Sequence, residues 1–183
     1  MRRVLAPTLL VAALALTACT ADPDPSESSA PGGRTAACAS AAASSGEGGA
    51  DAVDVAGQVG QKGEADYAAV FAGARVRDDG TSVDVYRKPS ADFDKWVLDT
   101  FGSTCVVLND AKFSAAELAK RYQQVNDDHE YWSGQGVSVN SVSSDFVRGV
   151  VIVGTDDPDK AAPLFKTRYA DGVPVELVKE APA

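Results

Sequence analysis

The sequence has little of the residue types on which common catalytic and metal sites depend. It contains one histidine, His129, and three cysteines among 183 residues. Protein zinc sites usually combine several histidine or cysteine ligands, so we expect neither a metal site nor a resident cofactor. The sequence also lacks the G-x-S-x-G, P-loop and dinucleotide-binding fingerprints. We therefore predict a protein without enzymatic activity.

Basic residues are also scarce. Lysine and arginine number 17 against 26 aspartates and glutamates, for a formal net charge of −9. Loss of Arg2 and Arg3 with an N-terminal leader would leave 15 basic residues and a net charge of −11. Because an acidic domain repels phosphate backbones, we expect no nucleic-acid partner. No apolar run approaches the ~20 residues that a membrane-spanning helix needs.

The N-terminus has the pattern of a leader. Two arginines follow Met1, an apolar run extends from Val4 to Leu16, and small residues precede Cys19. The segment Leu16-Thr17-Ala18-Cys19 resembles the lipobox of bacterial lipoproteins. The resemblance implies cleavage before Cys19, acylation of Cys19, and attachment to the extracytoplasmic face of the cell membrane. The alternative is an ordinary secretory signal in which a cysteine merely follows Ala18.

The composition divides the chain into three parts. Residues 1–18 are the expected lipoprotein signal peptide, residues 19–64 a lipid-anchored flexible linker, and residues 65–183 a globular domain. The linker is rich in proline, glycine, serine and alanine, which bury too little apolar area to offset the entropy lost on ordering. Three valines, at positions 53, 55 and 59, indicate a weak helix or strand that docks on the domain.

Cys38 and Cys105 remain once Cys19 is assigned to lipid. An exported compartment permits disulfides, and a Cys38–Cys105 bridge would pin the linker to the domain. Such a long closed loop would contribute about 4 kcal/mol of stability. The alternative is two free thiols, with Cys38 in the linker and Cys105 in a strand of the core.

Residues 65–183 predict an α+β fold, with helices packed on an antiparallel sheet. A hairpin turns at residues 78–81, and Ser90 caps a helix over residues 91–101. Ser114 and Glu117 form a capping box for a continuous helix that extends to about Trp132. The remaining expected elements are a strand at 104–109, a hairpin at 137–153 turning at 143–145, a helix from 156 to 169 and a strand at 173–178.

Hairpin, helix and strand occur twice, which suggests two ββαβ repeats joined by the helix at 113–132. A shift of 68 residues aligns Val83 with Val151, Val97 with Phe165, and Phe101 with Tyr169. Without a gap, it also aligns Cys105 and Val107 with Val173 and Val175. Any regular ββαβ pattern gives some such overlap, so duplication and coincidence both stay open.

Several polar and aromatic residues could indicate a site, but each has a structural explanation that we favour. His129 shares an apolar helical stripe, which predicts a partly buried histidine. The aspartates at 156, 157 and 159 suit helix capping better than calcium binding, and those at 78 and 79 suit a turn. Trp96 and Trp132 lie on apolar stripes and should pack in the core, whereas Tyr131 is freer to contact a ligand.

These features lead to three functional hypotheses. The first is a membrane-anchored, non-enzymatic module of the cell envelope that binds a protein, wall polymer or small solute. The second is a module acting in trans on secreted serine proteases, because Phe71-Ala72-Gly73, Arg168-Tyr169 and Val173-Pro174-Val175 are similar to hairpin-and-helix propeptides of chymotrypsin-like proteases. The third is an enzyme with an unfamiliar site, which would require a concave pocket with convergent polar side chains.

Overall fold

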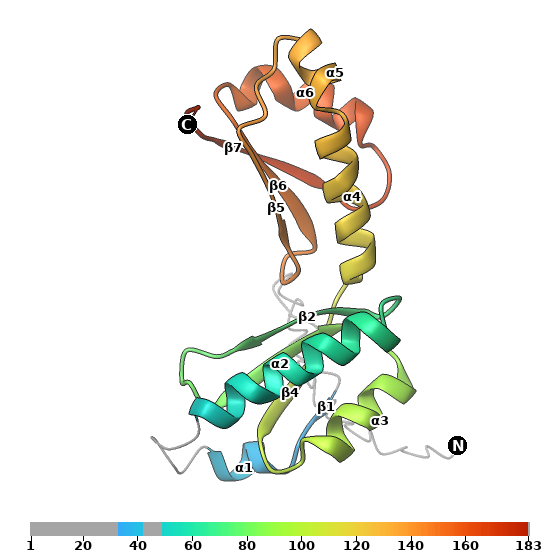
Figure 1. Cartoon of the computed structure of the whole chain (residues 1–183), viewed down its shortest axis with the longest axis vertical. Helices are drawn as coiled ribbons and strands as arrows, with labels where there is room; N and C mark the ends of the chain where they lie inside the picture. The colour runs from blue at the N-terminus through green and yellow to red at the C-terminus, as the bar shows by residue number, and fades with distance from the viewer. Residues whose placement is uncertain (1–32, 42–48, 183) are drawn as a thin grey trace, which may run out of the picture.

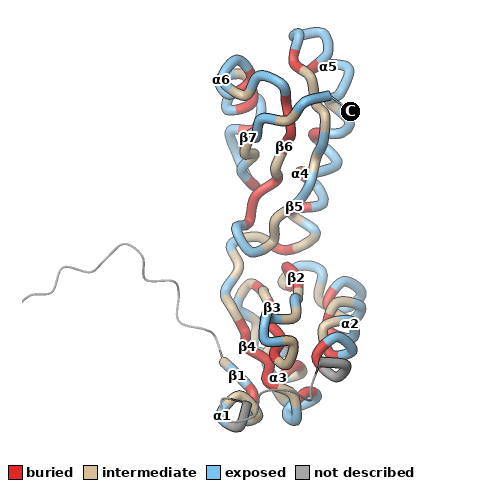
Figure 2. Tube along the Cα trace, turned by 90° about the vertical axis from the view of Figure 1, so that its left-hand side faces the viewer, coloured by how far each residue is buried: buried red, intermediate tan, exposed pale blue. Residues whose placement is uncertain are grey.

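The computed structural model describes residues 33–41 and 49–182. They form two lobes stacked along the long axis of the molecule (Figure 1). The N-terminal lobe comprises residues 33–41 and 49–112, and the C-terminal lobe comprises residues 113–182. Each lobe has its own sheet and its own cluster of buried apolar side chains, visible as separate buried segments in Figure 2. No helix in the described ranges has both the length and the apolar character needed to cross a bilayer.

The N-terminal lobe is a four-stranded sheet covered by helices. Its sheet order is β1-β4-β3-β2, and α2 and α3 pack on one face around Val59, Val85 and Phe93, all of which are fully buried. Ser90 caps α3 as expected, accepting a hydrogen bond from the Phe93 amide. The elements are β1 (Gly33–Arg34), α1 (Ala37–Ala41), α2 (Gly49–Asp66), β2 (Phe71–Val76), β3 (Ser82–Arg87), α3 (Ala91–Thr100) and β4 (Cys105–Asp110).

The C-terminal lobe repeats this plan with three strands in the order β5-β6-β7. Its core is centred on Trp132, which is fully buried and stacks on Phe165 with ring centroids 4.0 Å apart. The capping box of Ser114 and Glu117 is present at the start of α4. The elements are α4 (Ala115–Asp127), α5 (His129–Gly134), β5 (Ser141–Asp145), β6 (Val150–Thr155), α6 (Pro158–Arg168) and β7 (Val175–Lys179).

The α+β class is confirmed, but the expectation of purely antiparallel sheets is wrong. The hairpins β2–β3 and β5–β6 are antiparallel, whereas β3 pairs with β4, and β6 with β7, in parallel. The reason is that a helix separates the strands of each parallel pair. A helical crossover returns the chain to the same end of the sheet, so the next strand runs in the same direction.

The two lobes match in register as well as in topology. Adding 68 to the residue numbers of β3 gives those of β6, and the pair Val76–Val83 becomes the observed pair Ser144–Val151. The final strand departs from the gapless alignment. Val83 pairs with Val106, and its counterpart Val151 pairs with Val175, so the last strand follows a shift of 69. The C-terminal lobe thus has one extra residue between α6 and β7.

The folded region begins before residue 65, so the expected linker at 19–64 is too long. In α2, Ala52, Val55 and Val59 recur at helical spacing and are buried in the core of the N-terminal lobe. The frequent glycines of this stretch argue against a helix by propensity, but burial of the apolar stripe overrides them. Gly63 even assists packing, since a Cβ there would lie 2.5 Å from the Phe71 ring.

An earlier segment, residues 33–41, is joined to β4. The structure contains the Cys38–Cys105 disulfide rather than two free thiols. Beside it, the Thr35 hydroxyl donates to the Thr104 carbonyl at 2.6 Å and accepts from the Val106 amide at 3.0 Å. Residues 1–32, 42–48 and 183, including Cys19 and part of the expected linker, lie outside the described residues.

Two boundaries in the C-terminal lobe also differ from expectation. The long helix is interrupted at Asp128, whose carboxylate bonds Arg168 and Tyr169. The second hairpin turns at residues 146–149 instead of 143–145. Gly149 there adopts a φ of +67°, and Asp145 accepts the amides of the two residues after Phe146. The location of the turn is therefore set by Gly149 and by the hydrogen bonds to Asp145, and the alternation of side chains along the strands did not reveal it.

The lobes meet through the tip of the β5–β6 hairpin, which points at the N-terminal lobe (Figure 1). Phe146 at this tip lies against Gly73, where a Cβ would come within 2.5 Å of the ring. Its ring also contacts Tyr86 edge-on, with centroids 5.5 Å apart. A salt bridge of 3.1 Å between Lys88 and Glu117 adds a second link between the lobes.

We expect Phe146→Ala to loosen the two lobes without unfolding either one. Removing the ring leaves Gly73 facing a void and should lower the free energy of unfolding by about 1–2 kcal/mol. Small-angle scattering should show a larger radius of gyration. Val147→Ala is the matched control, because Val147 is the exposed neighbour on the same tip. Equal scattering curves for wild type and Phe146→Ala would contradict the expectation.

Candidate functional site

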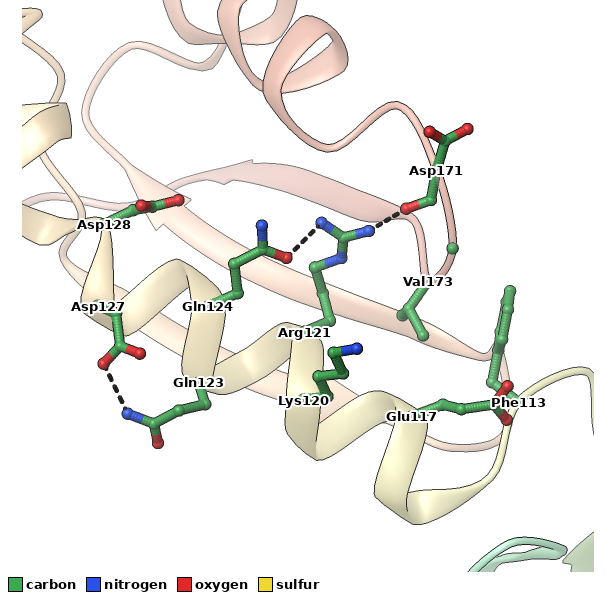
Figure 3. A pocket seen from close by; sticks show the side chains of 11 residues that line it. Phe113, Glu117, Lys120, Arg121, Gln123, Gln124, Asp127, Asp128, Asp171 and Val173 are labelled. Carbon is green, nitrogen blue, oxygen red and sulfur yellow. Dashed lines mark hydrogen bonds between the residues drawn. The ribbon is translucent and has the colours of Figure 1, made fainter.

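The C-terminal lobe has an open pocket of about 780 Å³ between α4 and the loop that connects α6 to β7. Figure 3 shows its lining side chains. One face of α4 forms one wall, from Glu117 through Arg121 to Asp128. Residues 171–173 form the opposite wall, and Phe113 closes one end. We refer to this cavity as the Arg121 pocket.

Arg121 is the central group of the pocket. Only 8% of its surface is exposed. One terminal nitrogen, Nη1, donates to the Gln124 side-chain oxygen at 2.9 Å, and the other, Nη2, donates to the Asp171 carbonyl. The guanidinium also lies over the Tyr169 ring, 4.9 Å from its centroid. Neutral acceptors and an aromatic face therefore hold this charge in place, and Nε makes no hydrogen bond to any residue in the described ranges.

The carboxylates at the two ends of the pocket already have cationic partners. Glu117 accepts from the Ser114 amide at 2.7 Å and from Lys88 at 3.1 Å, and these hydrogen bonds, the one from Ser114 foremost, lower its pKa. Asp128 accepts from Nε of Arg168 at 2.6 Å and from the Tyr169 hydroxyl at 2.8 Å. The pocket wall thus combines two neutralised carboxylates with a buried cation between them.

Asp128 is also the first member of a hydrogen-bonded chain that reaches the core. The bonds from Arg168 and Tyr169 lower the pKa of Asp128. Burial raises the pKa of Tyr169 to about 12, so its hydroxyl stays protonated at neutral pH. The indole nitrogen of Trp132 donates to that hydroxyl at 3.0 Å. These hydrogen bonds hold the side chain of Tyr169 in place, and its ring in turn packs against the guanidinium of Arg121.

The pocket is located where the C-terminal lobe departs from the N-terminal one. The buried stripe of α2 comprises Ala52, Val55 and Val59, and the stripe of α4 has the same spacing at Leu118, Arg121 and Val125. An arginine therefore stands in the middle of the α4 stripe, where the α2 stripe has a valine. The extra residue between α6 and β7 falls in the opposite wall of the same pocket. Gly172 in this wall has a φ of +80°, and a Cβ there would lie 3.3 Å from Nη2 of Arg121.

A second concavity, of about 530 Å³, lies between the lobes. Five alanines line it, together with the larger apolar side chains of Leu118, Tyr122 and Phe146. Unlike the Arg121 pocket, it has no buried polar group to orient a ligand. Its lining includes Glu64, Ala68, Ala72, Ala115, Ala116, Leu118, Ala119, Tyr122, Ser144 and Phe146.

The structure places the residues singled out in the sequence as follows. His129 is exposed at the start of α5, so the expectation of a partly buried histidine is wrong; the break at Asp128 turns it away from the seam. Asp157 caps α6 and Asp79 accepts turn amides, as expected.

The aromatic residues lie as follows. Trp132 is a core residue, and Trp96 is partly buried and stacks on Tyr67. Tyr131 is exposed and lies 3.9 Å from the Arg168 guanidinium.

Sequence reasoning missed Arg121, the group with the most unusual environment. An arginine within a polar helix gives no signal on its own. The signal that could have identified it is its position, because it lies three residues after Leu118 and four before Val125, within an apolar helical stripe. No group of three or more potential metal ligands occurs among the described residues.

The chain was also compared with known proteins. No family model matches it, and a search of curated proteins found no matching sequence. Interpretation of the site therefore depends on its geometry.

We expect the Asp128 network to make the C-terminal lobe sensitive to acid. Because the folded-state pKa of Asp128 is lowered, its stabilising effect is complete above about pH 4 and is lost as pH falls through the folded pKa. Asp128→Asn should therefore be less stable than wild type at pH 7, and the difference should shrink as pH falls below about 4. Urea unfolding followed by tryptophan fluorescence measures the free energy of unfolding of wild type and Asp128→Asn at each pH.

The matched control is Asp127→Asn, since Asp127 bonds only the neighbouring Gln123 among the described residues. A stability difference between wild type and Asp128→Asn that stays constant from pH 7 to pH 2 would contradict the role assigned to this carboxylate.

Proposed function

We propose that this protein is a lipid-anchored, non-enzymatic binding module of the cell envelope, and that its ligand occupies the Arg121 pocket. The N-terminal segment would fix it to the outer face of the cell membrane through Cys19. The two lobes would project from that anchor, with the pocket on the lobe farther along the chain from it. The only predicted membrane contact is the lipid.

The observation that supports this proposal most directly is the Cys38–Cys105 disulfide. Structural disulfides form and persist in oxidising compartments and are rare in the cytosol. The bridge therefore agrees with the export that the Leu16–Cys19 motif implies. Cys19 precedes Gly33 by 14 positions. A fully extended chain of that length spans at most about 50 Å, so the lobes would stay close to the membrane surface.

The geometry of the Arg121 pocket favours binding over catalysis. A general acid or base must reach the reacting group in a titratable state. The carboxylates of Glu117 and Asp128 are engaged with Lys88 and Arg168, and Asp127 accepts from Gln123. The Asp171 carboxylate points away from Arg121 (Figure 3), and His129 lies outside the pocket lining. What the pocket offers is a fixed cation beside apolar surface, which suits recognition of a ligand.

Regulation of secreted proteases in trans has less support. Phe71 and Ala72, which suggested it, are 2% and 4% exposed. Gly73 is covered by Phe146 of the other lobe. These residues therefore serve the core and the interlobe contact, and are not presented to a protease.

We expect replacement of Cys19 to release the protein from the membrane. Wild type should partition into the detergent phase with the mass of residues 19–183 plus acyl groups. Cys19→Ser should appear without lipid, because serine offers no thiol for acylation. Phase partitioning followed by intact mass spectrometry, before and after reduction, measures the anchor and the disulfide together.

Cys38→Ser is the matched control: it removes the disulfide and should leave the acyl mass unchanged. An unacylated wild-type protein recovered from the medium would refute the anchor, although the Arg121 pocket would still be present.

A further inference from the structure

We propose that the Arg121 pocket binds a small organic carboxylate. The carboxylate would lie on the guanidinium of Arg121, and the apolar body of the ligand would pack against Phe113 and Val173. This inference rests on the proposed function as a binding module and names the ligand class that the module takes.

The first argument is the state of the Arg121 charge. A charge withdrawn from water needs a counter-charge or a full set of hydrogen bonds. Arg121 is 8% exposed, yet it forms no salt bridge with any residue in the described part of the chain. Arginine has five N–H donors in a rigid fork. The two observed bonds, to Gln124 and to the Asp171 carbonyl, orient that fork and leave donors facing the pocket.

The nearby carboxylates do not supply the missing counter-charge. Glu117 is paired with Lys88, and Asp128 is paired with Arg168. Asp171 offers its backbone carbonyl to Arg121, while its own carboxylate points away from the guanidinium (Figure 3). The position opposite the guanidinium is therefore open to an anion from outside.

The surroundings favour a carboxylate over a phosphate. The chain has a formal net charge of −9, and Asp127 and Asp171 lie at the pocket margin, so a second negative charge on the ligand would be repelled. A planar carboxylate also matches the planar guanidinium in size and shape, and such pairs form two parallel hydrogen bonds. Lys120 extends from the same helix into the pocket and adds a mobile positive charge (Figure 3).

The apolar part of the pocket defines the rest of the ligand. Phe113 is partly buried at one end, and Val173 is 4% exposed in the loop wall. A ligand with an aliphatic or aromatic body would bury area against both side chains while its carboxylate reaches Arg121. The open shape suits an acid of modest size, such as an arylalkanoic acid or the carboxyl end of a short peptide.

The test uses ¹⁵N-labelled full-length chain carrying Cys19→Ser, so that binding is measured independently of the lipid anchor. The probe is 3-phenylpropionate, and 3-phenylpropanol supplies the same apolar body without the charge. We expect saturable shifts of the Gln124 side-chain amide, the Arg121 Nε–H and the Gly172 amide, with a dissociation constant on the order of 10 mM or tighter for a ligand of this size. The alcohol should bind at least about tenfold more weakly, as expected for loss of a charge-assisted hydrogen bond.

Variants then separate recognition from folding. Arg121→Gln should weaken binding by at least about tenfold, and Arg121→Lys should restore only part of it because the fork is lost. Lys120→Gln should weaken binding a few-fold with no change in thermal stability, since Lys120 is exposed and forms no salt bridge with the described residues. Lys179→Gln removes an exposed charge that does not line the pocket and should leave binding unchanged.

The inference is overturned by an absence of saturable shifts at these three groups, by equal binding of acid and alcohol, or by an effect of Lys179→Gln as large as that of Lys120→Gln. None of these results would bear on the anchor, which mass spectrometry tests separately.

Discussion

The crossover from strand through helix to parallel strand is the constraint on which both lobes depend. After α3 or α6 has crossed the sheet, the following strand lies beside the first strand of the crossover and runs in the same direction. This arrangement places the helix over one face of the sheet and buries Val85 with Phe93 in one lobe and Val153 with Phe165 in the other. The hairpin strands β2 and β5 then extend each sheet on the far side of β3 and β6.

Both lobes have the same arrangement of hairpin, helix and parallel strand, so the positions at which they differ stand out. Two of them place an aromatic or charged side chain at a defined contact. Phe146 at one hairpin tip joins the lobes, whereas the equivalent tip of the other lobe is the acidic turn at residues 78–81. Arg121 interrupts the buried apolar stripe of α4, and the loop that faces it is one residue longer than its counterpart in the N-terminal lobe. The C-terminal lobe thus differs from the N-terminal lobe around one pocket, while both lobes share the same strand pairing and each has an apolar core under its crossover helix.

Much of the fold could be predicted from the sequence, because local chemistry specified it. The capping box at Ser114 and the cap at Ser90 located helix starts, and Gly80 located a turn. Strand direction could not be predicted from the alternation of side chains, since alternation is the same in parallel and antiparallel pairs. The sequence predicted only a weak helix or strand where α2 lies, because its glycines lower helix propensity and its stability depends on burial against Phe71 and other core residues.

The site was harder to predict than the fold. Burial of Arg121 depends on a loop 50 residues away in sequence, which no local pattern indicates. The same holds for the break after α4, which depends on the ion pair between Asp128 and Arg168. Such long-range polar contacts are decided by tertiary packing, which local patterns in a single sequence do not show.

The disulfide has a mechanical and topological consequence. Cys38 and Cys105 close a covalent ring of chain that contains α2, β2, β3 and α3. Any tension on the chain before Cys38 passes through the bridge into β4, an interior strand of its sheet, and bypasses α2 entirely. A single backbone cut anywhere inside the ring would likewise leave every fragment covalently attached, so the lobes would stay connected to the N-terminal segment after the cut.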